Sequence, residues 1–161
     1  MSLNIESAKP EHIPAILALL REFAEYESLL DYLEVNEERL NAALFGEGAA
    51  PSVAEAIVAF IDDAAVGYAI FYPNFATFRG QRGMYLEDIY IQPAHRRGGT
   101  GEKMLRYICR LAKERGLERM DFMVLDWNTP AVNFYKKLGA EIDQQERHFK
   151  FTDQAFKELA S

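Results

Sequence analysis

A basic, glycine-rich turn lies between two apolar segments near the middle of the chain. The turn reads Arg96-Arg97-Gly98-Gly99-Thr100-Gly101. The segment before it, residues 84–91, is rich in aliphatic and aromatic residues, which is typical of a buried strand, and the segment after it has helical spacing. Glycines at a helix start let the backbone approach a ligand closely, and free N–H groups there attract anions. The turn therefore predicts a phosphate or pyrophosphate site.

Two common phosphate motifs do not fit this turn. A P-loop would need glycine before Lys103 and Ser or Thr after it, and a dinucleotide fingerprint would need a third glycine where Met104 stands. The pattern that fits is Arg/Gln-x-x-Gly-x-Gly/Ala, formed here by Arg96, Gly99 and Gly101. The plain alternative is an ordinary strand–turn–helix segment with a solvated basic turn.

This pattern resembles the acetyl-CoA pyrophosphate loop of the GCN5-related N-acetyltransferase (GNAT) superfamily. The resemblance implies acetyl-CoA as the cofactor, held partly by a strand in which a bulge opens a gap for the pantetheine arm. The resemblance also assigns Asn128 to the pantetheine amides, although this residue could instead be a simple helix cap. The cofactor-binding residues that we expect are Ile89, Tyr90, Ile91, Arg96, Arg97, Gly98, Gly99, Thr100, Gly101, Glu102, Asn128, Pro130, Ala131 and Lys137.

Several further stretches are similar to the spermidine/spermine (diamine) N-acetyltransferase branch of that superfamily. The resemblance implies a small cationic amine as acceptor, a homodimer, and Tyr26, Glu27 and Asp88 as acceptor-binding residues. Gln144 and Glu146 stand where the diamine enzymes have a glutamate and a tryptophan that help to hold the polyamine, so the identity of the amine stays open. The matching stretches are Tyr26-Glu27, Gly67-Tyr68-Ala69, Tyr85-Leu86-Glu87-Asp88, Leu125-Asp126-Trp127-Asn128 and Asn133-Phe134-Tyr135-Lys136.

Two neighbouring acids provide the first candidates for proton transfer. An alkyl ammonium has a pKa near ~10.4, so it must lose a proton before it can attack a thioester. We expect Glu87 to be the general base, directly or through water; the alternative is a structural carboxylate at a strand edge. Asp88 would point to the opposite face of a regular strand, so only a local bulge brings both acids to one cleft.

A tyrosine is the candidate donor of a proton to the departing thiolate. A phenol with a pKa near ~10 can protonate a departing thiolate, whose conjugate acid lies near ~8.5. We expect Tyr135 to be this general acid, because it lies within the matched Asn-Phe-Tyr-Lys stretch. Its alternative is a core aromatic on the helix face that carries Ala131 and Leu138.

Composition narrows the class of protein. The 161 residues suffice for one domain, 1–161, and 49% hydrophobic with 27% charged residues is typical of a soluble globular protein. One cysteine cannot form a disulfide framework, three scattered histidines suggest no metal site, and no signal or membrane-spanning segment is apparent, so we expect a cytoplasmic protein without a membrane partner. The net charge of −7 disfavours a nucleic-acid partner and favours a cationic substrate.

The elements that must position these residues follow from hydrophobic periodicity and turn signals. The strand–helix–strand segment around the glycine-rich turn implies a parallel pair, and the hairpins imply antiparallel neighbours. The order matches the GNAT fold: an α/β protein with a single mixed, twisted sheet of about seven strands and helices on both faces. We expect strands over residues 3–7, 53–61, 66–72, 84–91, 121–125, 140–142 and 147–151, with helices following Pro10, Asn36, Gly101 and Thr129.

We therefore predict an acetyl-CoA-dependent N-acetyltransferase. It would transfer an acetyl group directly to a primary amine of a small cationic acceptor that is diamine-, polyamine- or lysine-like. One alternative is a non-catalytic CoA-binding or regulatory module, against which the presence of both Glu87 and Tyr135 argues. The other is an N-acetyltransferase with a protein or drug amine as acceptor.

Overall fold

A computed structural model describes residues 2–161. Contacts divide the chain into two compact units, residues Met1–Met123 and Val124–Ser161, and each is described by itself. The single domain spanning 1–161 stays a prediction.

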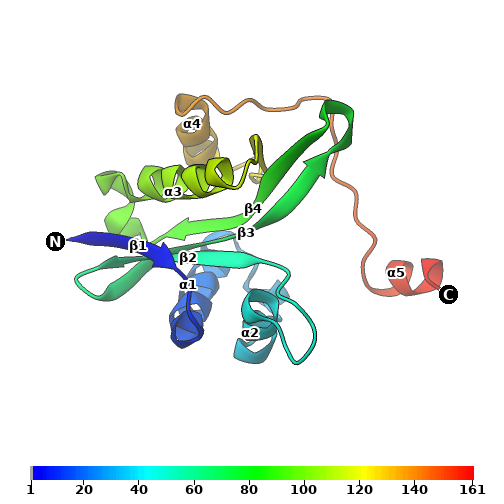
Figure 1. The fold of residues 1–161 in the computed structure, drawn as a ribbon, viewed down its shortest axis with the longest axis horizontal. Helices are drawn as coiled ribbons and strands as arrows, with labels where there is room; N and C mark the ends of the chain where they lie inside the picture. The colour runs from blue at the N-terminus through cyan, green and yellow to red at the C-terminus, as the bar shows by residue number, and fades with distance from the viewer. Residues whose placement is uncertain (1) are drawn as a thin grey trace. The chain divides into compact units, whose positions relative to one another are not determined.

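The first unit contains a mixed five-stranded sheet in the order β1-β2-β3-β4-β5 (Figure 1). Neighbours are antiparallel except β4 and β5, which are parallel because a helix crosses over between them. The strands are β1 (Leu3–Ser7), β2 (Glu55–Ile61), β3 (Ala64–Ala76), β4 (Gln81–Ile91) and β5 (Arg119–Phe122). The α/β class and the mixed sheet are therefore confirmed.

The expected number of about seven strands is wrong. Residues 140–142 and 147–151 form no strand, although the second segment alternates apolar and polar residues. Phe149 and Phe151 are 85% and 65% exposed. Strand propensity describes how a residue fits a pleated, half-buried surface, and without a partner ladder it does not produce a strand.

Helices cover both faces of the sheet in the first unit (Figure 1). One face carries α1 (Ile13–Tyr26) and α2 (Glu37–Phe45), and the other carries α3 (Thr100–Glu114). Short 3₁₀ segments are η1 (Pro10–His12), η2 (Leu30–Tyr32), η3 (Thr77–Arg79) and η4 (Pro93–Gly98). The second unit contains α4 (Thr129–Lys137) and α5 (Asp153–Leu159), the latter not predicted.

The core on the α1 side explains why these helices form where they do. Ile13, Ile16 and Leu19 lie at helical spacing on α1 and are buried with Leu40 and Leu44 of α2. They pack against the sheet residues Val58, Tyr68, Ile70 and Tyr90. This core fixes α1 over β3 and β4, and β4 carries the candidate acids Glu87 and Asp88.

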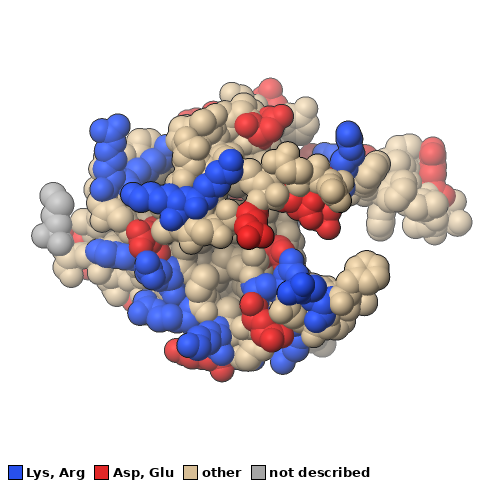
Figure 2. All heavy atoms as spheres, turned by 90° about the horizontal axis from the view of Figure 1, so that it is seen from above, with Lys and Arg blue, Asp and Glu red and all other residues tan. Residues whose placement is uncertain are grey.

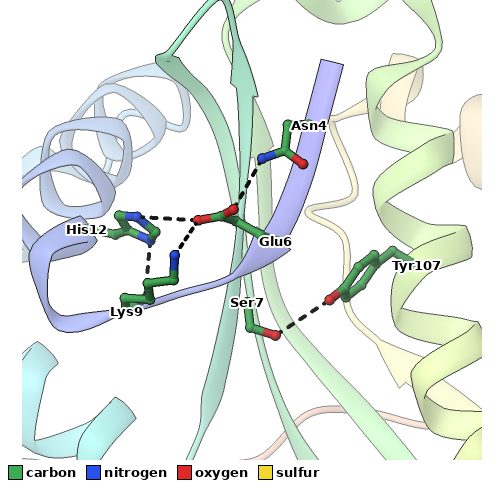
Figure 3. Close-up of polar contacts among 6 residues, drawn as sticks. All are labelled: Asn4, Glu6, Ser7, Lys9, His12 and Tyr107. Carbon is green, nitrogen blue, oxygen red and sulfur yellow. Dashed lines mark hydrogen bonds and ion pairs between the residues drawn. The ribbon is translucent and has the colours of Figure 1, made fainter. Parts of the chain in front are cut away.

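A polar cluster joins β1 to the start of α1 (Figure 3). Glu6 accepts a 3.2 Å hydrogen bond from Lys9 Nζ, and this bond is the main reason that the pKa of Glu6 is lowered. The Lys9 main-chain N–H donates to His12 Nδ1, so the Nε2 of His12 faces Glu6 at 3.6 Å. The Ser7 and Tyr107 hydroxyls lie 3.5 Å apart and connect β1 to α3. The cluster fixes the edge of the sheet rather than a cleft.

Charges of both signs are distributed over the surface. Figure 2 shows Lys and Arg atoms interspersed with Asp and Glu atoms on the face that it presents. Within residues 2–161, no helix is long and apolar enough to cross a membrane.

Candidate active site

A β-bulge on β4 brings the two candidate acids to one face of the sheet. Asp88 pairs with Ile70, and the next pair is Leu86 with Phe71, so Glu87 is an extra residue on β4. Ile70 and Tyr72 are two residues apart on β3 and share the face towards α1. Glu87 lies on that same face, because its carboxylate accepts a hydrogen bond from Tyr72. The bulge that is required to bring both acids to one face is therefore present.

The two acids have different surroundings. Glu87 is exposed, and its Oε2 accepts a 3.0 Å hydrogen bond from the Tyr72 hydroxyl, whose ring stacks on Tyr85. Asp88 is half-buried, and burial raises its pKa to about 6, with further contributions from the negative charges of Glu87 and Glu27. The site therefore concentrates negative charge that an ammonium group would neutralise.

The end of α1 carries a third carboxylate whose charge acts on this site. Tyr26 is the last residue of α1 and Glu27 is its C-cap, after which Ser28 takes a left-handed conformation. Burial raises the pKa of Glu27. The negative charge of Glu27 contributes to the raised pKa of both Asp88 and Tyr68, so Glu27 adds to the negative potential at the two acids of the bulge.

β4 has an edge that can accommodate an extended ligand. Its parallel pairing with β5 covers only Gly83 to Leu86, whereas its pairing with β3 continues to Ile91. Among residues 2–161, no strand pairs with the β5-side edge of β4 beyond Leu86. Main-chain groups there can bond an amide-containing chain such as pantetheine. The assignment of Ile89, Tyr90 and Ile91 to the cofactor fits this edge and stays a prediction.

The glycine-rich turn leads into α3 with the geometry of an anion site. Gly99 has φ +78° and is the N-cap of α3, and a Cβ built on it would meet nothing within 4 Å. Backbone conformation, rather than lack of space, therefore requires glycine at this position. The N–H groups of Thr100, Gly101 and Glu102 lie in the first turn of α3, where an α-helix supplies no acceptor.

Arg96 connects this turn to α1, a role that the sequence did not indicate. Its Nε donates a 2.8 Å hydrogen bond to the Ile91 carbonyl oxygen. Its guanidinium carbon lies 4.7 Å from the Tyr26 ring centroid and 5.4 Å from that of Tyr90. The expected acceptor-side residue Tyr26 and the expected cofactor-side residue Arg96 are thus in contact.

Sequence reasoning missed the polar partners contributed by neighbouring elements. Tyr72 holds Glu87, and Tyr68 lies beside Asp88. Glu22 on α1 accepts hydrogen bonds from the Tyr90 hydroxyl at 3.3 Å and from Gln92 Nε2 at 3.0 Å. Alternation along residues 66–72 places Tyr68 and Tyr72 on one face and could have indicated them, but their pairing with a bulged strand is not visible in the sequence.

The remaining candidates belong to the second unit. Asn128 is buried, and its Oδ1 accepts a 3.4 Å hydrogen bond from the Ala131 N–H, so its capping role is present. Pro130 lies in the first turn of α4, and Lys137 is the last residue of that helix. Burial raises the pKa of Tyr135 to about 12. Within residues 2–161, no group of three or more His, Cys, Asp or Glu side chains could hold a metal ion.

A bulged central strand, a free strand edge and a helix that begins after a glycine form the candidate site of the first unit. The model of the acetyltransferase (GNAT) family matches residues 14–140. The chain belongs to this family, and it is an N-acetyltransferase. The family, the fold class and the enzyme class that the sequence predicts are confirmed.

Relatives and solved structures agree with this assignment. The chain is 38% identical to the thialysine N-epsilon-acetyltransferase of Bos taurus over 97% of this chain and 96% of the relative. It is 29% identical to the human spermidine/spermine N(1)-acetyltransferase-like protein 1, over 85% of this chain and 20% of the relative. An integron cassette protein from V. cholerae shares the fold, with a TM-score of 0.80 at 21% identity over 99% of this chain and 98% of that one.

Proposed function

We propose that the protein transfers the acetyl group of acetyl-CoA to the side-chain amine of a small lysine-like amino acid. The observation that carries this proposal is the pair of acids at the β4 bulge, Glu87 and Asp88, on which the charge of Glu27 at the end of α1 also acts. A cationic acceptor suits these acids, since each ammonium neutralises charge that is partly desolvated. The names of the relatives support the acceptor class: thialysine in Bos taurus, and ornithine in an Arabidopsis thaliana enzyme that is 33% identical over 61% of this chain and 43% of its own.

Acetyl-CoA, when bound, supplies the acetyl group as an activated thioester. The N-terminus of α3 and the Arg97 side chain would bind its pyrophosphate, and the β5-side edge of β4 would hold its pantetheine arm. The acids at the bulge bind the ammonium and remove one proton from it, and Tyr135 donates a proton to the departing sulfur.

Direct transfer suits this site better than a covalent enzyme intermediate. The single cysteine, Cys109, lies in the middle of α3, and burial raises the pKa of its thiol, which disfavours the reactive thiolate. We further propose a cytoplasmic homodimer, and light scattering of the purified chain tests the dimer.

A thiol-release assay with acetyl-CoA tests the acceptor class. The panel is thialysine, lysine, ornithine, putrescine, spermidine and a monoamine of similar length. The proposal expects the highest kcat/KM for an amino acid with a terminal amine. Equal rates for all amines, or a preference for spermidine, would contradict it.

A further inference from the structure

Tyr68 presents a buried hydroxyl to the acidic group at the bulge. The residue is 0% exposed, and its ring belongs to the core between the sheet and α1. Its hydroxyl is close enough to Asp88 to alter the pKa of both groups, yet it forms no hydrogen bond of standard geometry with residues 2–161. A buried hydroxyl without a full hydrogen bond is unfavourable, so this group has a strong tendency to donate to an ionised carboxylate beside it.

Packing leaves the Tyr68 hydroxyl little freedom, because the aromatic ring is enclosed on all sides. Asp88, in contrast, is half-buried, so part of it is accessible to solvent. Tyr68 can therefore fix one carboxylate oxygen while the other is directed towards an incoming ligand. Glu87 is held differently, since it is exposed and the Tyr72 hydroxyl that donates to it belongs to a side chain that is only partly buried.

We propose that Asp88, positioned by the buried Tyr68 hydroxyl, takes the proton from the acceptor ammonium, while Glu87 binds that ammonium by charge. This exchanges the roles that the sequence suggested for the two acids, and it rests on the proposed function of amine acetylation. In the step, an N–H bond of the ammonium breaks and its electron pair stays on nitrogen. The proton joins an Asp88 oxygen and is later released to water, and the neutral amine attacks the thioester carbonyl.

The surroundings of Asp88 suit this proton transfer. The titratable groups that face it are Tyr68 from β3, Glu87 from β4 and Glu27 from the end of α1, and Tyr90 follows two residues later on the same strand. Burial and the two negative charges make Asp88 a stronger base than an ordinary aspartate, with a pKa of about 6, whereas Tyr68 lowers that pKa. Asp88 is thus ionised at neutral pH and still basic enough to accept a proton.

Kinetics as a function of pH test the proposal on the purified full chain with its best amine. Asp88→Asn should lower kcat by roughly 10²–10⁴-fold and abolish the acidic limb of the kcat/KM profile. Glu87→Gln should mainly raise the acceptor KM and keep that limb. Tyr68→Phe should move the limb to higher pH, because it removes the group that lowers the pKa of Asp88. Tyr72→Phe is the matched control, since it removes the hydroxyl that donates to Glu87 rather than the one beside Asp88. It should leave the pH of the acidic limb unchanged.

The opposite pattern would overturn the proposal: an acidic limb lost in Glu87→Gln and retained in Asp88→Asn, or one that Tyr68→Phe does not move. Calorimetric binding of acetyl-CoA by each variant establishes that it is folded. If Asp88→Asn does not fold, the proposal is tested by whether Tyr68→Phe moves the acidic limb of the kcat/KM profile to higher pH. The proposed function fails on a different result, namely that the wild-type enzyme prefers an amine outside the lysine-like class. In that case the same pH profiles, measured with the preferred amine, still show which carboxylate takes the proton.

Discussion

Single residues carry the chemistry that we assign to this protein. Gly99 provides a backbone conformation, Asp88 an unusually basic carboxylate and Tyr135 a phenol whose pKa of about 12 keeps it protonated. The sequence nominates all three positions, because residue type, spacing and family resemblance are enough to nominate a site. It favoured Glu87 over Asp88 as the base, but the surroundings that distinguish the two acids, namely Tyr68, Tyr72 and burial, are not visible in the sequence.

Gly99→Val should weaken acetyl-CoA binding. Its φ of +78° is unfavourable for any side chain and most of all for a β-branched one, although space is available. The left-handed conformation costs about 1–2 kcal/mol, so we expect the dissociation constant to rise roughly 5- to 30-fold. Gly98→Val is the control, because no positive φ is required there and its Cβ would also meet nothing within 4 Å. If calorimetry shows that both substitutions raise the dissociation constant equally, the backbone conformation of Gly99 is not the cause.

Tyr135→Phe should lower kcat by roughly 10²–10⁴-fold, because it keeps the ring but removes the donated proton. The KM for acetyl-CoA should change little, since ground-state binding is not removed. An acetyl thioester with a leaving thiol of lower pKa should partly rescue the variant. Steady-state rates near wild type, with chemistry shown to be rate-limiting, would leave Tyr135 as a packing residue.

Elements bring these residues together through pairings that are distant in the sequence. The bulge aligns Glu87 with Asp88, the end of α1 adds Glu27, and the contact of Arg96 with Tyr26 joins the cofactor turn to α1. Two residues that we assign to different substrates, Tyr26 to the acceptor and Arg96 to the cofactor, are therefore in contact.

Tyr26→Leu should weaken acetyl-CoA binding even though Tyr26 lies on α1. Its ring supports the Arg96 guanidinium at 4.7 Å, and such a cation–π contact is worth about 0.5–1 kcal/mol at an exposed site. We expect a rise of roughly two- to fivefold in the dissociation constant measured by calorimetry. Tyr32→Leu, at a tyrosine that is 79% exposed, should have no such effect. An unchanged constant in Tyr26→Leu would show that the contact does not support the turn.

At the scale of the whole molecule, the acidic site should reduce stability. The pKa of Asp88 is raised from 3.8 in an unfolded chain to about 6 in the folded one. Between these values the unfolded chain has lost the proton while the folded one retains it, so unfolding releases a proton and stability falls as pH rises. Above pH ~6 Asp88 is ionised in both states, and the full loss of folding stability is present.

Asp88→Asn should therefore stabilise the protein at neutral pH. The upper limit of the gain is about 3 kcal/mol, and it should disappear below pH ~4, where both forms are uncharged. Denaturant unfolding of both proteins at pH 4 and pH 7.5 measures this difference. A gain that is the same at both values would indicate that ionisation of Asp88 is not its cause.

Local chemistry in the sequence determined the start of α3 after a glycine, the cap at Asn128 and the apolar stripe of α1. Each depends on neighbours within a few positions, so propensity and periodicity indicate it directly. Tertiary structure alone decided the register that makes Glu87 a bulge residue, the placement of Tyr68 beside Asp88 and the contact of Arg96 with Tyr26. It also decided that residues 147–151 form no strand. These features depend on which partner lies across the sheet or across the core, and no short stretch of sequence contains that partner.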